Sequence, residues 1–190
     1  NYYICYVTLE NKNLSHLPVY LLSEDQMSRY AIYMATLGNR PDLFPGSEYV
    51  GKYTETPEGY EVPREYLDDE TFAAILSEAE KYIGYPYVWG GSSPATSFDC
   101  SGYVSWVINH SGWNVGRLGA QGLYNICTPT SNPQPGDLVF FKGTYDTPGV
   151  SHCGIYVGDN KMLHCGDPIG YANLNTSYWQ SHFYAYGRLP

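Results

Sequence analysis

Two short segments that read as β-strands, residues 153–157 and 161–165, flank the turn-forming sequence GDN at residues 158–160. Strand-like runs around such a turn predict an antiparallel β-hairpin. If the loop has an odd number of residues, His152 lies opposite His164 on one face, with Cβ atoms roughly 4.5–5.5 Å apart. A two-residue loop would shift the pairing by one residue and send His164 to the other face. The register of this hairpin therefore decides whether the two imidazoles can meet.

The odd-loop register also sorts the neighbouring side chains between the two faces. One face carries His152, Gly154, Tyr156, Met162 and His164. The other face carries Cys153, Ile155, Val157, Leu163 and Cys165. Because the second set is apolar, we expect it to face the protein core.

Residues 99–110 carry apolar side chains at helical spacing, between a loop-like segment at 94–97 and Gly112. This pattern predicts a helix whose first turn contains Cys100, with Ser97 or Asp99 as its N-cap. Unpaired backbone N–H groups and the positive end of the helix dipole favour a thiolate at that position. The same N–H groups are donors that an oxyanion can use.

Three side chains that can take part in nucleophilic catalysis follow one another along the chain: Cys100, His152 and His164. A thiol is a useful nucleophile only as the thiolate, so it needs a base or a helix N-terminus that lowers its pKa. The base in turn needs a polar group that holds its ring in place. The set therefore supplies candidates for a nucleophile, a base and an orienting residue.

A zinc site is the other chemical interpretation of these residues, since thiolates and imidazoles are zinc ligands. However, no Cys-x-x-Cys pair occurs, and alternation directs Cys153 and Cys165 away from the histidine face. We therefore expect no metal site. Five cysteines leave at least one unpaired, so no structural disulfide is predicted, although a Cys153–Cys165 bridge is open if these two are cross-strand neighbours.

Five motifs follow one another along the chain: YPYVWGG at 85–91, FDCSGYV at 98–104, QPGDLVFF at 134–141, HCGIYVG at 152–158 and MLH at 162–164. In this order they resemble the NlpC-type cell-wall cysteine peptidases, over about residues 72–190. The resemblance implies a papain-like α+β domain, with the nucleophile at a helix N-terminus packed on an antiparallel sheet. It implies hydrolysis of the peptidoglycan stem peptide, typically between D-γ-glutamate and the diamino acid. It also implies Cys100 as nucleophile, His152 as general base and His164 as orienting residue, and no cofactor is expected.

The resemblance extends to residues around the nucleophile. Tyr87 lies in a segment that lines the cleft and can help to stabilise the oxyanion, and Trp89 shapes the cleft. Asp99 and Ser101 flank the nucleophile, and in relatives that require a free stem N-terminus the aspartate holds the amino group. Cys153 is a departure, because the family usually has a small or branched apolar residue after the base. A buried thiol behaves as a small hydrophobe, so we expect the mechanism to be unaffected.

Three other functions fit the same residues. An amidase of the Cys-His type would cut the bond between the sugar and L-Ala instead. A wall-binding module with a decayed site would hydrolyse nothing, although the intact Cys100, His152 and His164 argue against it. An acyltransferase would share the acyl-thiol intermediate, with an amine in place of water.

The composition excludes some partners. A net charge of −9 and a pI near 4.8 argue against binding to nucleic acid or to an anionic membrane surface. No transmembrane run or signal peptide occurs, and the chain begins with Asn1, so we expect a mature form or fragment whose upstream domain or anchor is missing. From the resemblance we expect an extracellular, cell-wall setting, in a Gram-positive bacterium.

The chain divides into an N-terminal extension, residues 1–70, and a catalytic domain, residues 71–190. In the extension, residues 2–9 predict a strand, and a capping box at 23–26 begins a helix that ends near Gly38. Acidic residues at 68–70 open a further helix that ends at Gly84. The extension resembles the spacer before this domain in cell-wall hydrolases of conjugative elements, and we expect it to pack against the catalytic domain or to continue into a missing upstream domain.

Overall fold

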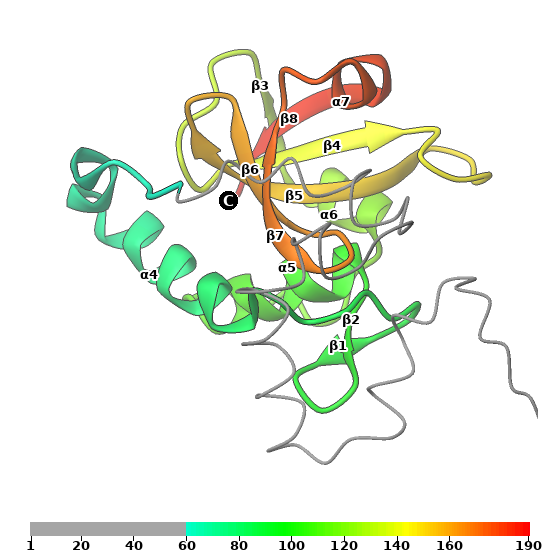
Figure 1. Cartoon of the computed structure of the whole chain (residues 1–190), viewed down its shortest axis with the longest axis horizontal. Coiled ribbons are helices and arrows are strands. Elements are labelled where there is room, and N and C mark those ends of the chain that lie inside the picture. Colours follow the sequence, from blue (N-terminus) through cyan, green and yellow to red (C-terminus); the bar gives the residue numbers. More distant parts are fainter. Residues whose placement is uncertain (1–59) are drawn as a thin grey trace, which may run out of the picture.

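A six-stranded antiparallel sheet lies at the centre of the structure, a computed structural model that describes residues 60–190 (Figure 1). Its strand order is β3-β8-β4-β5-β6-β7. The strands are β3 (Thr128–Thr130), β4 (Leu138–Lys142), β5 (Val150–Gly158), β6 (Lys161–Cys165), β7 (Ile169–Asn173) and β8 (Phe183–Arg188). A separate two-stranded ribbon, β1 (Ser92–Ser93) and β2 (Ser97–Phe98), lies just before the central helix.

Helices cover both faces of the sheet. On one face lie α4 (Glu70–Ala79), α5 (Cys100–Asn109) and α6 (Ala120–Ile126), and on the other lies α7 (Ser177–His182) (Figure 1). Short 3₁₀ turns, Arg64–Asp68 and Glu80–Tyr82, flank α4. The α+β fold class predicted from the sequence is confirmed.

Each sheet face has its own buried cluster. The cluster under α4, α5 and α6 contains Cys153, Ile155, Val157, Leu163 and Cys165, the set predicted to face the core. The cluster under α7 contains Tyr156, Met162 and Trp179, together with side chains of β4 and β7. The predicted division of the hairpin into two faces is therefore confirmed, and both faces are buried.

The β5–β6 hairpin combines a two-residue turn with a β-bulge, and the bulge was not predicted from the sequence. Its turn has two residues, Asp159 and Asn160, both with positive φ as a tight hairpin turn requires. The pairing then shifts between Tyr156 and Gly158, where β5 has one residue more than β6. This bulge offsets the one-residue shift that the turn would otherwise cause.

The bulge also changes which residues lie opposite each other. Ile155 pairs with Leu163, so continuing the register places His164 across from Gly154. His152 lies one diagonal step away on the same face. The predicted direct opposition of the two histidines was therefore wrong, whereas their shared face was right.

Helix α5 begins as predicted, with Cys100 as its first residue and Asp99 as its N-cap. Of the two predicted N-caps, Ser97 and Asp99, it is Asp99 that caps the helix. Its carboxylate accepts a hydrogen bond from the Gly102 backbone N–H at 2.7 Å. A Cβ atom on Gly102 would overlap the carbonyl oxygen of Gly91. Only glycine therefore lets the Gly91 segment lie against the first turn of α5.

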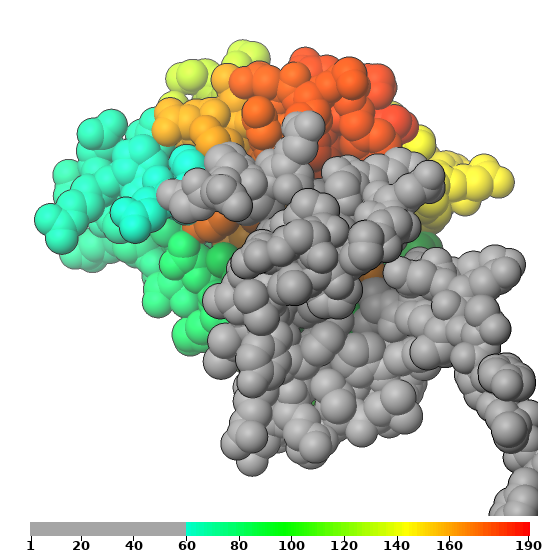
Figure 2. Space-filling view, in the orientation of Figure 1, coloured from blue at the N-terminus to red at the C-terminus, as the bar shows by residue number. Residues whose placement is uncertain are grey.

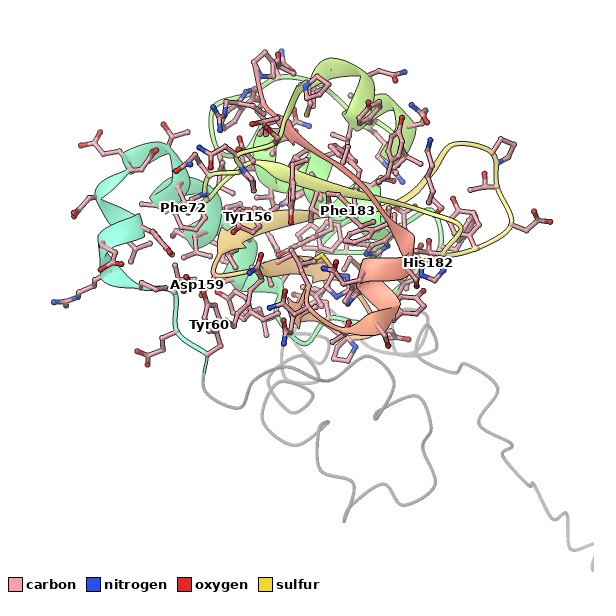
Figure 3. All side chains as sticks on the ribbon, turned by 90° about the horizontal axis from the view of Figure 1, so that it is seen from above. Tyr60, Phe72, Tyr156, Asp159, His182 and Phe183 are labelled. Atoms are coloured by element: carbon pink, nitrogen blue, oxygen red, sulfur yellow. The ribbon has the colours of Figure 1, made fainter. Side chains whose placement is uncertain are left out.

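Residues 60–79 pack along the edge of the sheet near the β5–β6 turn. The Tyr66 hydroxyl donates to Asp159 at 2.9 Å, and the Tyr60 ring packs edge-to-face on Tyr171 at 5.1 Å. In the space-filling view the first part of the described chain, in cyan, lies beside the region of the β5–β6 turn, in orange (Figure 2). Seen from above, Tyr60 and Asp159 lie at the opposite end of the molecule from His182 (Figure 3).

The helix expected at 68–84 is present as α4 and the following 3₁₀ turn, with Asp69 as N-cap. The strand expected at 2–9 and the helix expected at 23–38 lie outside the described residues. The domain boundary after residue 70 stays a prediction. Within residues 60–190, no helix has the length and apolar character needed to cross a bilayer.

Candidate active site

Cys100 occupies the first turn of α5, where the helix lies against β5. Its side chain is only 5% exposed. A hydrogen bond from the Cys153 side chain, together with the charge and hydrogen bond of His152, holds the pKa of the Cys100 thiol well below its usual range. These effects outweigh burial, which acts in the opposite direction. The arrangement therefore favours a thiolate at Cys100, the form that attacks carbonyl carbon.

His152 and His164 form a hydrogen-bonded pair on the α7 side of the sheet. His152 Nε2 lies 2.8 Å from His164 Nδ1, and the two rings are nearly perpendicular, at 82°. The bond uses one ring nitrogen of His152 and leaves Nδ1 for the hydrogen bond to Cys100. When His152 is an imidazolium, its Nε2–H donates to the lone pair of His164 Nδ1. His164 can thus orient the ring of His152 and stabilise its charged form.

Gly154 makes room for this pair. A Cβ atom at Gly154 would lie 3.0 Å from the His164 Cβ and 2.8 Å from the Met162 sulfur. Any larger residue would displace His164 from its place across the strand. The glycine that follows Cys153 is therefore explained by packing of the histidine pair.

His164 makes the stability of the fold depend on pH. Burial, and next the charge of His152, lower the pKa of His164 well below its usual value. In the unfolded chain a histidine titrates near pH 6.5, so below that pH the unfolded state binds a proton that the folded state does not. Stability is therefore lost as pH falls below about 6.5, with a slope that approaches about 1.4 kcal/mol per pH unit for this group.

We expect His164→Asn to be less stable than the parent near neutral pH but to show a shallower loss between about pH 6.5 and pH 5. Urea unfolding at several pH values in this range measures the slope. His110→Asn is the matched control, because the His110 side chain is exposed. Parallel slopes for the parent and His164→Asn would contradict a neutral, buried His164.

Trp179, from α7, covers the histidine pair. Its ring stacks on His152 with centroids 5.4 Å apart and an interplanar angle of 27°, and it meets His164 edge-on at 5.2 Å. Phe141 of β4 packs against both Trp179 and His152. This apolar cover excludes water from the bond between the two imidazoles, which strengthens it.

Two tyrosines, Tyr87 and Tyr145, lie close enough to Cys100 for its charge to affect their pKa values. Burial, followed by the negative charges of Cys100 and Asp99, raises the pKa of Tyr87 far above its usual value, so its hydroxyl keeps its proton. Trp89 is 70% exposed and packs edge-to-face against Tyr145, itself 42% exposed. The charge of Cys100 also contributes to a raised pKa of Tyr145, after burial. Tyr87 therefore keeps a hydroxyl proton close to Cys100, and the Trp89–Tyr145 pair is exposed at the surface.

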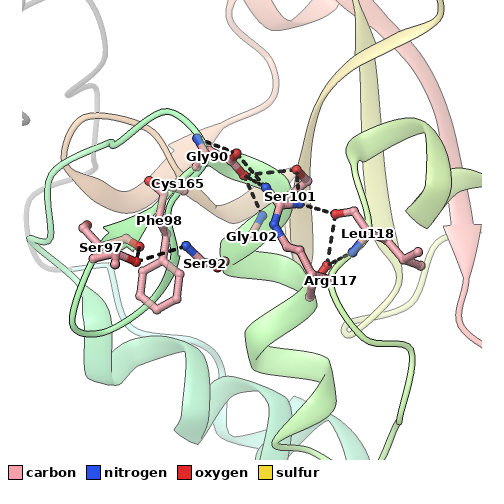
Figure 4. Close-up of polar contacts among 12 residues, drawn as sticks. Gly90, Ser92, Ser97, Phe98, Ser101, Gly102, Arg117, Leu118 and Cys165 are labelled. Atoms are coloured by element: carbon pink, nitrogen blue, oxygen red, sulfur yellow. Dashed lines mark hydrogen bonds and ion pairs between the residues drawn. The ribbon is translucent and has the colours of Figure 1, made fainter.

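Asp99 accepts hydrogen bonds from several groups at the start of α5, and Figure 4 labels its partners Gly90, Ser101, Gly102 and Arg117. Both carboxylate oxygens accept from the same nitrogen of Arg117, at 2.8 and 2.7 Å. Backbone N–H groups of Gly102 and Gly90 donate to one oxygen each. The Ser101 hydroxyl donates to Asp99 at 3.1 Å and accepts from Arg117 at 2.9 Å. Asp99 thus joins three segments, the helix start, the loop at Gly90 and Arg117.

The sequence model of the NlpC/P60 family matches residues 84–188, more than half of the chain. The chain belongs to the NlpC/P60 family. The resemblance seen in the five motifs is thereby confirmed.

Relatives of this NlpC/P60 domain include named cell-wall enzymes. The chain is 41% identical over 121 residues to the bifunctional muramidase/DL-endopeptidase CwlT of Bacillus subtilis, covering 62% of this chain and 36% of that protein. It is 42% identical over 117 residues to the probable endopeptidase p60 of Listeria seeligeri, covering 60% of this chain and 22% of that protein. The matched segment is thus well under half the length of these relatives.

A solved structure is similar to this chain in both sequence and fold. An NLP/P60 family protein similar to a lipoprotein, from Staphylococcus aureus Mu50, is 42% identical and superposes with a TM-score of 0.62. The match covers 74% of this chain and 46% of that one. The papain-like α+β fold expected from the motifs is confirmed by this likeness.

The structure brings the predicted site residues of this NlpC/P60 domain together. Cys100, His152 and His164 form a chain of hydrogen bonds, and Tyr87 lies beside Cys100. Asp99 and Ser101 turn toward Arg117, which sequence reasoning did not single out. Trp179 and Tyr145 were missed as well, because isolated aromatic residues outside the motifs carry no signal of position.

The sulfur atoms of the described region are not joined. Cys100, Cys127, Cys153 and Cys165 are free thiols, and residues 60–190 hold no group of three or more histidine, cysteine or acidic side chains arranged for a metal ion. Cys165 donates instead to the Phe98 carbonyl oxygen at 3.2 Å.

Proposed function

We propose that this chain is the catalytic part of a peptidoglycan hydrolase, a cysteine endopeptidase that cleaves the stem peptide between D-γ-glutamate and the diamino acid. The observation that carries the proposal is the Cys100–His152–His164 chain of hydrogen bonds at the start of α5. The name DL-endopeptidase, borne by a relative 41% identical to this chain, supports the substrate class. Because the substrate lies outside the cytoplasmic membrane, the proposed setting is the cell wall of a Gram-positive bacterium.

The chemistry follows from the positions of these side chains. The Cys100 thiolate attacks the γ-glutamyl carbonyl carbon, forming a C–S bond while the carbonyl electron pair moves onto oxygen. Backbone N–H groups of the first turn of α5, with the Tyr87 hydroxyl, donate to this oxyanion. The His152 imidazolium then gives its proton to the departing amine of the diamino acid. His164 holds the ring of His152 through this transfer.

Water completes the cycle. His152, now neutral, accepts a proton from a water molecule that attacks the acyl-thiol carbonyl. The C–S bond breaks, the glutamyl product leaves as the carboxylic acid, which loses its proton to solvent, and the thiolate–imidazolium pair is restored. Each proton taken up by His152 is thus released in the next half of the cycle.

The surroundings of Asp99 bear on substrate selection. Its two oxygens already accept from the Arg117 guanidinium, two backbone N–H groups and Ser101. An added ammonium group would have to compete with Arg117 for the same lone pairs. We therefore propose that Asp99 has a structural role in this chain, and that stems still attached to the sugar through L-Ala are accepted.

Digestion of purified peptidoglycan tests the proposal. Intact sacculi, and free stem peptides released from sacculi by an amidase, are incubated with the chain and with Cys100→Ala, and the soluble fragments are identified by mass spectrometry. We expect fragments cut after D-glutamate from the parent alone, and from both substrates. Cleavage between the sugar and L-Ala would identify an amidase instead. No product from either form would favour a wall-binding role, and cleavage of free stems alone would overturn the role given to Asp99.

A further inference from the structure

Two aromatic side chains of the site region are left in contact with water. Trp89 is 70% exposed, the largest exposed fraction among the large apolar side chains of residues 60–190, and Tyr145 is 42% exposed. Their rings meet edge-to-face, with centroids 5.1 Å apart and an interplanar angle of 82°. Tryptophan is highly buried on average, so an exposed tryptophan paired with a second aromatic ring is typical of a binding surface.

The backbone holds Trp89 in this exposed position. Residues 88–91 form a tight turn, closed by a hydrogen bond from the Gly91 N–H to the Val88 carbonyl oxygen at 2.9 Å. Trp89 is the first corner of the turn, and Gly90, the second, has the positive φ of 78° that a type II turn requires there. The Gly90 N–H donates to the Asp99 carboxylate at 3.0 Å (Figure 4). The Gly91 carbonyl oxygen accepts from the Asp99 N–H, also at 3.0 Å, so the turn is fixed to the start of α5 at two points.

Tyr145 reaches the same place from the other side of the site. It belongs to the loop between β4 and β5, residues 143–149. The Thr144 N–H donates to the Ser151 hydroxyl at 3.0 Å, and the two hydroxyls lie 2.7 Å apart, which ties this loop to β5 directly before His152. The pair of rings therefore joins the turn before the Cys100 helix to the strand that carries His152.

The proposed mechanism gives the substrate a direction. His152 protonates the departing amine, so the diamino acid leaves on the β5 side of Cys100. The acyl part of the stem then extends the other way, across the start of α5, past Asp99 and toward the turn that carries Trp89. In an intact wall that part is D-glutamate, L-Ala and then the lactyl group of a muramoyl sugar, roughly 10 Å in all when extended. The sugar therefore arrives beside this turn.

We propose that Trp89 and Tyr145 form a subsite for the N-acetylmuramoyl sugar that carries the stem peptide. The proposal rests on the proposed function and adds the glycan to the substrate of the same site. The face of an aromatic ring is negative and attracts the weakly positive C–H groups on the flat side of a pyranose. Because the two rings are nearly perpendicular, they form a corner in which one ring takes the flat side of the sugar and the other takes its edge.

Charge also favours this occupant. The carboxyl group of the muramoyl sugar is joined to L-Ala in an amide bond, so the sugar is neutral when it carries a stem. The carboxylate nearest the turn, that of Asp99, is paired with Arg117 at 2.7 Å. With a net charge of −9, the chain has no general attraction for anionic polymers. Stacking on a neutral sugar needs no such attraction.

The experiment compares two substrates that differ only in the sugar. One is the disaccharide–tetrapeptide, and the other is the same tetrapeptide with an acetyl group on L-Ala, so that both are uncharged at that end. The ratio of their kcat/KM values is measured for the parent, Trp89→Ala, Tyr145→Ala, Trp89→Phe and Tyr145→Phe. We expect the parent to prefer the sugar-bearing substrate about tenfold. The preference should fall toward one in both alanine variants and largely remain in the phenylalanine variants, which keep a ring.

Tyr184→Ala is the matched control. Tyr184 is 39% exposed, but it packs against Lys142 and Tyr124 and not against Trp89. Its variant should keep the preference of the parent. A parent ratio near one would overturn the proposal. Equal losses for the two substrates in Trp89→Ala would also overturn it, because the rings would then contact the peptide.

A binding measurement separates this proposal from the proposed function. Calorimetric titration of Cys100→Ala with each compound reports on affinity without hydrolysis. We expect the dissociation constant of the sugar-bearing compound to be about tenfold lower than that of the acetylated peptide, and the difference to disappear when Trp89→Ala is added. If the parent hydrolysed neither compound, the proposed function would fail, whereas equal affinities for the two compounds would overturn the sugar subsite.

Discussion

Replacing Cys100 by serine is expected to lower the rate of stem-peptide hydrolysis by a factor of about 10⁴ or more. The hydroxyl is a much weaker acid than the thiol, so the short-range interactions that favour a thiolate at the start of α5 cannot produce an alkoxide. The fold should be retained, because the two side chains differ little in size. Initial rates of fragment release, with thermal unfolding measured in parallel, test both parts of the prediction.

Cys127→Ser is the control for this substitution. Cys127 precedes β3, and burial raises the pKa of its thiol to about 12, so it is not a nucleophile at neutral pH. We expect nearly full activity from this variant. Comparable losses in Cys100→Ser and Cys127→Ser would mean that the rate depends on thiols in general and not on the hydrogen-bonded chain with His152.

The second large effect is expected at Gly102. In Gly102→Ala the new methyl group would overlap the Gly91 carbonyl oxygen, which itself accepts from the Asp99 backbone N–H at 3.0 Å. The backbone at Gly91 and Ser92 has little room to move away from the new methyl group. We therefore expect a loss of about 3 kcal/mol in the free energy of unfolding. Activity should fall as well, because the displaced segment leads from Tyr87 to the nucleophile. Urea unfolding and the hydrolysis assay measure the two effects.

Gly122→Ala provides the comparison. Gly122 lies within α6, and its added Cβ would meet only the flexible Leu118 side chain, at 3.3 Å. Alanine favours a helix interior over glycine by roughly 0.5–1 kcal/mol, so this variant should be as stable as the parent or slightly more so. If Gly102→Ala were equally well tolerated, the contact between the Gly91 segment and α5 would not constrain the fold.

Local patterns were sufficient to predict a helix with Cys100 in its first turn, to narrow its N-cap to Ser97 or Asp99, and to sort the hairpin side chains between two faces. These features depend on residues close in sequence, where spacing and capping chemistry act directly. The exact pairing of the histidines was not predictable in this way. It depends on a bulge near Gly158, whose cost and benefit are decided by packing on both faces of the sheet.

Contacts between distant segments were the main omission. Arg117 reaches Asp99 from the segment before α6, and Trp179 reaches His152 from α7. Neither Arg117 nor Trp179 lies in a motif, and the spacing of residues along the chain does not indicate which distant side chain either one will contact. The thiol contact between Cys153 and Cys100 is of the same kind, since the sequence indicated only a small buried residue at that position.

The separation of Cys100 from His152 along the chain has a consequence for when the thiol becomes reactive. Cys100 belongs to a helix, whereas His152 and Cys153 belong to a strand formed by a much later segment, and the groups that favour the thiolate meet only when α5 docks on β5. Before docking, Cys100 is an ordinary thiol with the modest reactivity of any cysteine. The reactivity of the Cys100 thiol therefore depends on the docking of α5 on β5, and opening of that contact alone is expected to return it to that of an ordinary cysteine.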